Sequence, residues 1–399
     1  METVELAAAF LVIIVLAALR VRISITMASA TSVLLLWSEA RPGTALAVAG
    51  RAAVDPATLE LVVTVGLITL LAGLLRNFGL LAPMSRSLAG TLRSDRLAFT
   101  LVPGILGCLP VPGGAGMSAP MVDGLGDTLG LSRPRKAAAN ILLRHAWFFV
   151  FPFSPPLILA AHLSGVTVSS IIGRQWPLAI LAVLTATLLF LSGRAAGQTP
   201  YGAWRGEARE FLITASPILV SVALFLAAGV RLPLALAAGV LLAGLVARQR
   251  HSFAWKLVRA SVDWEMPLAT EIIMVFAALV REAPGLGGVI ASASSGSVLP
   301  AIMVTSALAG FLTANPVAGL GIAMPALLPL VPGGHDLGAY ACLIFGLTYQ
   351  AYLVSPLHMC LVLTNRYFDV SLGRTYRHLL PAVMVNALGV LLLFFFTRS

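Results

Sequence analysis

Two stretches of the chain interrupt long apolar segments with the same pattern of glycine and proline. The first is PVPGGAGMSAP at 110–120 and the second is NPVAGLGIAMP at 315–325. A shift of 205 positions aligns three residues of each: Gly114, Gly116 and Pro120 with Gly319, Gly321 and Pro325. Prolines inside a helix remove backbone donors and break it. Paired interruptions in the two halves of a membrane protein point to the binding site of a transporter.

The segments around these interruptions are apolar enough to span lipid. Of the whole chain, 59% is hydrophobic and only 11% is charged, whereas about a quarter of a soluble protein is charged. We therefore expect an all-α membrane protein with no separate soluble domain. The net charge of +10 is explained by basic loops on one side of a bilayer, so no nucleic-acid partner is expected.

A span needs ~20 apolar residues, and the sequence offers ten. They are 5–20, 24–38, 60–82, 137–161, 176–193, 211–229, 232–247, 266–281, 338–364 and 380–397. The segments 98–126 and 298–331 carry too many prolines and glycines to be continuous helices. Each arm of about a dozen residues would reach ~18 Å, short of the ~30 Å hydrocarbon core. These two segments are predicted to be re-entrant hairpins.

The distribution of basic residues predicts the topology. With the N-terminus outside and each hairpin returning to its own side, eighteen of the 26 Lys and Arg residues lie in inside loops and six lie outside. Cytoplasmic loops carry such an excess. Both termini are then expected outside, with the first hairpin open to the cytoplasm and the second open to the exterior.

Other matches extend the internal repeat in the same order along the chain. They are Leu74–Arg76 with Leu279–Arg281, Ser154-Pro155 with Ser355-Pro356, and Gly173–Trp176 with Gly373–Tyr376. Each half has five spans, and because five is odd the second half enters the membrane inverted. We expect repeat 1 at 1–195 with its hairpin at 98–126, a cytoplasmic linker at 196–210, and repeat 2 at 211–399 with its hairpin at 298–331.

Irregular backbone at membrane depth persists only where it is buried in protein or lines a wet cavity. Free N–H groups at the starts of the return helices favour anions, and free carbonyls at the ends of the inbound helices suit Na⁺. The interruptions at 152–156 and 355–356 add two more breaks. Four discontinuities are thus predicted to converge near the middle of the membrane.

The candidate substrate-binding residues are those at or beside the interruptions: Gly114, Gly116, Ser118, Arg144, His145, Ser154, Asn315, Gly319, Gly321, Ser355 and His358. The candidate ion-coupling residues are Ser118, Thr313 and Asn315. Other roles stay open for several of them. The hydroxyl and amide side chains can cap broken helices, Arg144 can extend toward the membrane surface, and the histidines can satisfy neighbouring carbonyls.

Several motifs resemble one known family. The run at 110–120 is followed by Asn140, Arg144-His145, Trp147, Phe151-Pro152 and Ser154-Pro155, and SPLHMCLVLTNRYF stands at 355–368. This set is similar to the domain-of-unknown-function 401 family of prokaryotic membrane proteins, in the ion transporter superfamily. The last segment also resembles late spans of citrate, gluconate and dicarboxylate permeases. The resemblance covers most of the chain, and the motifs of 110–155 are its most specific part.

The resemblance implies a homodimer in the inner membrane of a prokaryote. It implies that each protomer has a scaffold and a mobile transport subdomain that moves as an elevator. It also implies a small, anionic substrate coupled to Na⁺ or H⁺. The chain departs from the family pattern at Phe148, where an acid often follows the tryptophan, which argues against proton coupling through that position.

These observations favour a secondary active transporter that moves a small organic anion of the carboxylate type with Na⁺ or H⁺. A cation/proton antiporter or an anion channel on the same fold is the alternative. The sequence has no GxxxxGK[ST] motif for ATP, and no HExxH or GxSxG motif of an enzyme. No cofactor is expected apart from Na⁺ held by hairpin-tip carbonyls. The cysteines Cys108, Cys342 and Cys360 lack metal-ligand spacing, so we interpret them as packing residues and expect no metal site.

Overall fold

The computed structural model describes residues 2–37, 42–108, 114–191, 204–282 and 298–398, which form helices and no strands. The helices of the first half are α1 (Glu2–Ala18), α2 (Ile23–Trp37), α3 (Pro42–Val54), α4 (Pro56–Asn77), α5 (Leu81–Leu92), α6 (Asp95–Gly107), α7 (Gly114–Thr128), α8 (Arg133–His145), η1 (Ala146–Phe149), α9 (Pro155–Ser164) and α10 (Val168–Leu191). Those of the second half are α11 (Trp204–Leu226), α12 (Leu232–Gln249), α13 (Trp255–Ala260), α14 (Glu265–Glu282), α16 (Val298–Thr313), α17 (Pro316–Leu327), η2 (Leu328–Leu330), α18 (Leu337–Leu353), α19 (Met359–Phe368) and α20 (Leu372–Thr397).

Five of the described helices, α4, α10, α11, α12 and α20, are long and apolar enough to cross a membrane. Several further apolar helices are shorter, among them α9, α16 and α18. Many large apolar side chains on the outer faces are exposed, for example Leu188, Leu241 and Met384. Lipid is the environment that suits such a surface, so the chain is a multi-pass membrane protein.

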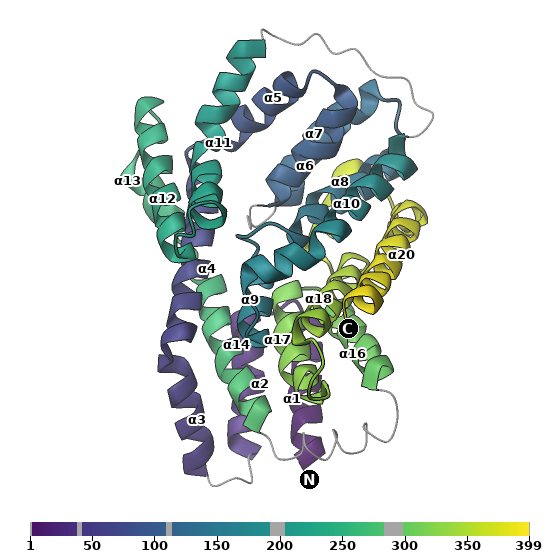
Figure 1. Cartoon of the computed structure of the whole chain (residues 1–399). Coiled ribbons are helices and arrows are strands. Elements are labelled where there is room, and N and C mark those ends of the chain that lie inside the picture. Colours follow the sequence, from purple (N-terminus) through teal and green to yellow (C-terminus); the bar gives the residue numbers. More distant parts are fainter. Residues whose placement is uncertain (1, 38–41, 109–113, 192–203, 283–297, 399) are drawn as a thin grey trace.

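The two interrupted segments occupy different ends of the molecule. Helices α6 and α7 pack against each other at the upper end in Figure 1, near α5 and α11. Helices α16 and α17 pack against each other in the lower half, near α1 and α14. Residues 109–113, which include Pro110, Pro112 and Gly113, lie outside the described residues. Each segment is thus a pair of short helices and not one long helix.

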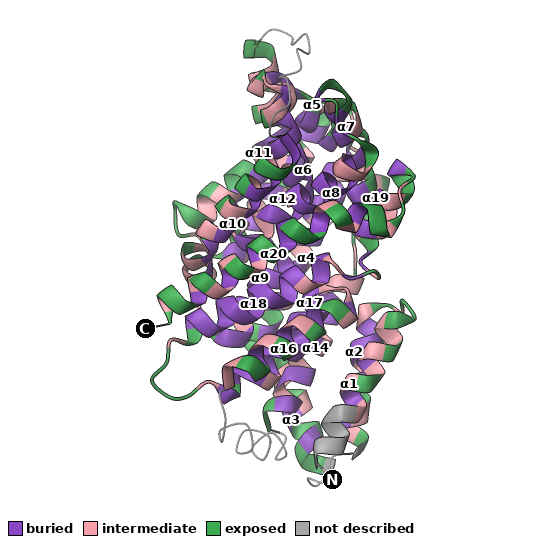
Figure 2. Cartoon of the chain, turned by 90° about the vertical axis from the view of Figure 1, so that its right-hand side faces the viewer, coloured by how far each residue is buried: buried purple, intermediate pink, exposed green. Residues whose placement is uncertain are grey.

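The second pair of interruptions lies beside the first. Helix α8 passes into the short turn η1 and then into α9, with an irregular stretch at 150–154. Helix α18 ends at Leu353 and α19 begins at Met359. These helices form the interior: Figure 2 shows α8, α9, α17 and α18 as largely buried. Along α8, every residue from Lys136 to His145 is buried.

The structure adds elements that the sequence analysis did not predict. The expected span 60–82 ends at Asn77, because Gly79 adopts a φ of +70° and turns the chain into α5. Helices α3 and α13 were also missed, since their charged and small residues resemble loops. Of the expected linker 196–210, residues 204–210 belong to α11, and 196–203 lie outside the described residues.

Local signals begin several helices where the sequence would place them. The side chain of Asp55 accepts from the amides of Ala57 and Thr58 at the start of α4. Asn315 caps α17 in the same way, and Asp336 caps α18. In α4 and α17 a proline at the first helical position supplies a suitable φ and no unsatisfied amide. The interruptions are therefore encoded locally.

Two close backbone contacts recur between the halves. A Cβ on Gly107 of α6 would lie 2.0 Å from the carbonyl oxygen of Arg144 on α8. A Cβ on Gly310 of α16 would lie 1.9 Å from the carbonyl oxygen of Thr348 on α18. Only glycine permits helices to approach so closely. The first hairpin helix of each half is thus held against the next long helix by an equivalent contact.

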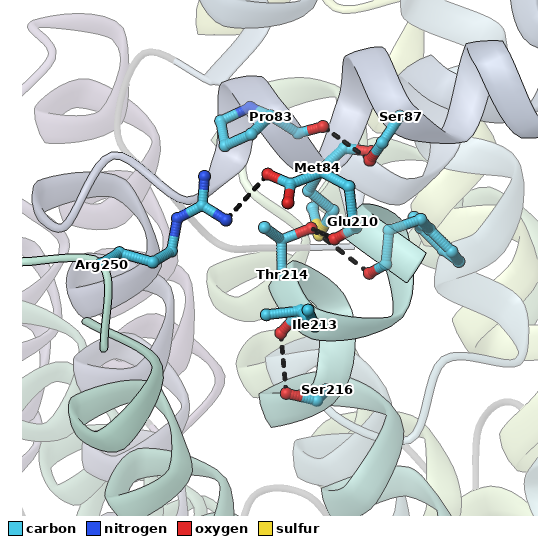
Figure 3. A network of polar contacts seen from close by, with 9 residues as sticks. Pro83, Met84, Ser87, Glu210, Ile213, Thr214, Ser216 and Arg250 are labelled. Carbon is cyan, nitrogen blue, oxygen red and sulfur yellow. Dashed lines mark hydrogen bonds and ion pairs between the residues drawn. The ribbon is translucent and has the colours of Figure 1, made fainter. Parts of the chain in front are cut away.

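At the upper end, α11 packs between α5 and α12. Figure 3 shows the polar contacts there, where Arg250 at the end of α12 forms an ion pair of 2.8 Å with Glu210 of α11. The hydroxyls of Thr214 and Ser216 donate to carbonyls of their own helix, and Ser87 does so in α5. These contacts are structural and lie apart from the interruptions.

Candidate functional site

One face of α8 carries three polar residues at intervals of four: Lys136, Asn140 and Arg144. Residues four apart share a helix face, and this face packs against α7. All three are buried, with exposed fractions of 2%, 0% and 4%. Buried polar and charged groups are costly unless they are paired, so the partners of each residue are informative.

The Lys136 ammonium is fully paired. Its Nζ lies 2.7 Å from Asp123 and 2.5 Å from Asp127, near the end of α7. These two carboxylates thus bind the lysine ammonium at this end of the α7–α8 contact.

Asn140 joins three helices. Its Oδ1 accepts from the Ser118 hydroxyl at 2.6 Å, and its Nδ2 donates to Thr364 of α19 at 2.9 Å and to the Ala115 carbonyl at 3.4 Å. Ser118 therefore lies in the second turn of α7 and is held by a buried network. Asn140 and Thr364 were not among the predicted site residues. Asn140 could have been predicted because it lies one helical turn before Arg144 and so shares its helix face. Nothing in the sequence indicated Thr364.

Arg144 differs from Lys136 because no carboxylate reaches it within the described part of the chain. Its Nη1 donates to Ser118 Oγ at 3.2 Å, and its Nε is buried with no hydrogen-bond partner. The guanidinium lies against the first residue of α7, since a Cβ on Gly114 would be 2.7 Å from Nη2. A buried cation beside a helix N-terminus, with an unpaired Nε donor, is an arrangement that an anion would complete.

The two glycines of this tip have different surroundings. Gly114 lies against Arg144, whereas a Cβ on Gly116 would meet no atom within 4 Å. In the second hairpin, Gly319 lies against the Thr348 methyl group, and Gly321 against Ile273 of α14. Of these four predicted residues, only Gly114 contacts a charged side chain.

The polar residues of the second tip satisfy one another. Thr313 Oγ1 donates to the carbonyls of Ala309 and Asn315 at 2.7 and 3.0 Å, and Asn315 Oδ1 accepts from two amides of α17. Ala314 between them has a φ of +49°, a left-handed conformation that is strained for alanine. The capping role that the sequence left open is thus present for Asn315, whereas the Thr313 hydroxyl donates to two carbonyls.

A pocket of about 170 Å³ opens at the second tip. It is bounded by Thr313, Ala314 and Asn315, by residues at the α1–α2 connection, and by Leu357 and Met359. Those last two residues flank His358. At the start of α19, the Cys360 thiol lies within hydrogen-bonding reach of the Ala115 amide in the first turn of α7. The stretch 357–360 therefore contacts both hairpin tips.

His145 lies beside this stretch. Its Nδ1 is 2.7 Å from the Ile141 carbonyl, and its ring centroid is 5.1 Å from that of His358. Tyr349 donates to the His145 carbonyl at 3.0 Å, and Tyr352 OH is 3.4 Å from His145 Nε2. The predicted residues His145 and His358 are thus brought together, next to Arg144.

Ser154 and Ser355 are buried at the other interruptions. The Ser154 hydroxyl has no hydrogen-bond partner among the described residues, and Ser355 Oγ accepts weakly from the Leu357 amide at 3.4 Å. No hydrogen bond joins either hydroxyl to Ser118 or Arg144 in the described ranges. The structure therefore brings together Gly114, Ser118, Arg144, His145 and His358, and Ser355 adjoins this group through its carbonyl, which accepts from the His358 amide at 3.0 Å.

Comparisons with known proteins agree with a membrane fold of this type. The sequence profile of the family described as "Protein of unknown function (DUF401)" matches residues 3–396. The crystal structure of the YdaH transporter from Alcanivorax borkumensis, described as having an unusual topology, is similar with a TM-score of 0.57 and 17% identity, over 87% of this chain and 85% of that chain. At this identity the similarity shows the fold alone. No curated protein gives a significant match.

Proposed function

We propose, from the premise that the chain belongs to the DUF401 family, that it is a secondary active transporter of a small organic anion. One observation carries the proposal: Arg144 is buried at 4% exposure beside the N-terminus of α7, and no carboxylate pairs with it in the described ranges. An unpaired buried charge costs several kcal/mol. A substrate carboxylate would supply the missing partner.

The arrangement of helices supports alternating access by two inverted repeats. Helices α6, α7 and α8 pack together as α16, α17 and α18 do, and α2 packs on α14 as α12 packs on α4. The equivalent contacts of Gly107 and Gly310 support the same correspondence. We propose that the hairpins with α8, α9, α18 and α19 form the mobile transport subdomain. The remaining spans form the scaffold, in a homodimer in the inner membrane of a prokaryote with both termini outside.

Coupling to Na⁺ or H⁺ is part of the proposal. The pocket at the second tip is lined by Thr313, Ala314 and Asn315, and their carbonyl, hydroxyl and amide oxygens are of the kind that suits a hard cation. Transport, and not catalysis, is the activity proposed. An anion channel is a second candidate because it would use the same Arg144, whereas a cation/proton antiporter would leave that arginine without a role.

The test is a thermal stability screen of the purified protein against a panel of small organic acids, with and without Na⁺ and at two pH values. We expect at least one carboxylate to raise the melting temperature, and Arg144→Ala to abolish the shift. Ser118→Ala should weaken affinity about tenfold, the effect of losing ~1.4 kcal/mol. Arg144→Lys keeps the charge and loses the planar donor fork.

Arg174→Ala is the matched control, because Arg174 has its own carboxylate at 2.7 Å, that of Asp336. This variant should keep the ligand shift of the parent. Stabilisation by neutral or cationic compounds only would refute the anion assignment. Saturable counterflow of the ligand in vesicles would separate a carrier from a channel.

A further inference from the structure

Three side chains with metal-ligating atoms meet where the broken helices of the two halves come together. One ligand atom each of His145, His358 and Cys360 lies within 4.8 Å of the others. His145 ends α8, and the other two residues stand at the start of α19. The histidines are buried, at 3% and 1% exposure. Sequence spacing gave no hint of this group, because 215 positions separate His145 from Cys360.

Both imidazoles are oriented as metal ligands usually are. His145 Nδ1 bonds the Ile141 carbonyl at 2.7 Å, and His358 Nδ1 approaches the Leu353 carbonyl at 3.4 Å. A ring nitrogen that faces a carbonyl carries the proton, which leaves the lone pair on Nε2. Ligating histidines typically donate their other N–H to a backbone carbonyl in this way.

The Nε2 atoms are poorly satisfied without a further partner. His358 Nε2 is buried and has no hydrogen-bond partner among the described residues. His145 Nε2 has only the Tyr352 hydroxyl, at 3.4 Å. Buried polar atoms are nearly always bonded, so an orphan nitrogen directed into a group of ligands points to a missing occupant.

Cys360 supplies the charge that a metal ion requires. Its thiol lies near the Ala115 amide and near the Arg144 guanidinium. Thiols bind metals as thiolates, so binding of a metal ion at Cys360 would release the thiol proton. Two neutral imidazoles and one thiolate make a soft ligand set with a single negative charge.

We propose that His145, His358 and Cys360 form a binding site for a soft, thiophilic metal ion, with monovalent copper favoured over Zn²⁺. Thiolate ligands select Cu⁺ and Zn²⁺ over hard cations. With one thiolate and two neutral imidazoles, a Cu⁺ ion would give a site with no net charge. A Zn²⁺ ion would give the site a net positive charge, beside the positive charge of the buried Arg144. Metal–ligand bonds of ~2.0–2.3 Å require the three atoms to approach by about 1 Å. His358 lies in the irregular segment 354–358, between α18 and α19.

An ion could reach the site from the pocket at the second hairpin tip, because Leu357 and Met359 line that pocket on either side of His358. The site goes beyond the proposed transport of an anion and does not depend on it. Metal binding is measured here without any organic substrate, so failure of one proposal is distinguishable from failure of the other.

The experiment measures metal bound to the purified full-length protein in detergent. The probes are Cu⁺ kept reduced without oxygen, and Zn²⁺. After desalting we expect one Cu⁺ per chain. Competition with a Cu⁺ chelator measures the Cu⁺ affinity, and a separate Zn²⁺ titration should show weaker binding of Zn²⁺. Cys360→Ser and His358→Gln should each weaken Cu⁺ binding by more than about tenfold, since losing even an outer-shell partner typically costs about 10–100-fold in metal affinity. Cys342→Ser is the matched control, because Cys342 lies on α18 outside the group, and it should bind as the parent does.

X-ray absorption of the copper-loaded parent keeps the proposal falsifiable if a variant does not fold. One sulfur and two nitrogen neighbours are expected. A shell without sulfur, or with more than one sulfur, would overturn the assignment, as would parent-like Cu⁺ affinity in folded Cys360→Ser. Tighter binding of Zn²⁺ than of Cu⁺ would overturn the stated preference.

Discussion

Lys136 and Arg144 share one face of α8, two turns apart, yet their surroundings are opposite. Lys136 meets two carboxylates, and Arg144 meets one hydroxyl and the end of a helix. Among the described residues, one buried cation on this face is thus fully paired and the next has no counter-ion. At the residue scale, this asymmetry separates the structural part of the α7–α8 contact from the part that we propose binds the anion.

Gly114 and Gly116 provide a matched pair of substitutions. Gly114→Ala would place a methyl group 2.7 Å from Arg144 Nη2, whereas Gly116→Ala would meet no atom within 4 Å. Because the arginine end is flexible, we expect Gly114→Ala to fold, to shift the guanidinium, and to weaken anion binding about tenfold. Gly116→Ala should bind like the parent. Titrating the ligand-induced melting shift measures both, and equal affinities would show that Gly114 does not position Arg144.

At the scale of the elements, the interruptions are the part of the fold that local sequence encodes. Asn315-Pro316 and Ser154-Pro155 each combine a residue preceding a helix with a proline at the first helical position. The sequence therefore predicted where these helices break. It did not predict α5, because the positive φ of Gly79 that ends α4 has no sequence signal apart from glycine itself, in a chain with 36 glycines.

The contact between α16 and α18 yields a prediction about stability. Gly310→Ala would bring Cβ to 1.9 Å from the Thr348 carbonyl oxygen. Backbone cannot yield as a side chain does, so the helices must separate, at a cost of about 1–3 kcal/mol. Gly107→Ala should have the same destabilising effect in the first half. The measurement is the melting temperature in detergent, which should be lower for each variant than for the parent.

Gly173→Ala on α10 is the control, since its Cβ would meet no atom within 4 Å. Alanine is the better helix former by ~1 kcal/mol, so this variant should be as stable as the parent or more so. If Gly310→Ala melted at the same temperature as Gly173→Ala, the close approach of α16 to α18 would be contradicted.

At the scale of the whole molecule, an inverted arrangement places equivalent loops on opposite sides of the membrane. Ser132 follows the first hairpin, and His335 follows the second, both in exposed positions. Single cysteines introduced there test this arrangement. A thiol reagent that cannot cross the membrane should label His335→Cys in intact cells, and Ser132→Cys only after the cells are opened.

The parent chain measures the background from its own cysteines, of which Cys342 is buried and the other two are half-buried. Labelling of both introduced cysteines from the same side would mean that the halves are not inverted. The proposal of alternating access by two opposed repeats would then fail, while the anion site at Arg144 would remain to be tested on its own.

The sequence by itself determined the membrane class, the positions of the breaks and most of the residues beside them, because hydropathy, proline and capping act over a few neighbouring residues. Only the tertiary structure decided which of those residues meet. It joined Asn140 to Thr364, left the Ser154 hydroxyl without a hydrogen bond among the described residues, and brought Cys360 to two histidines. These contacts depend on how helices from distant parts of the chain pack, and no short-range pattern specifies that packing.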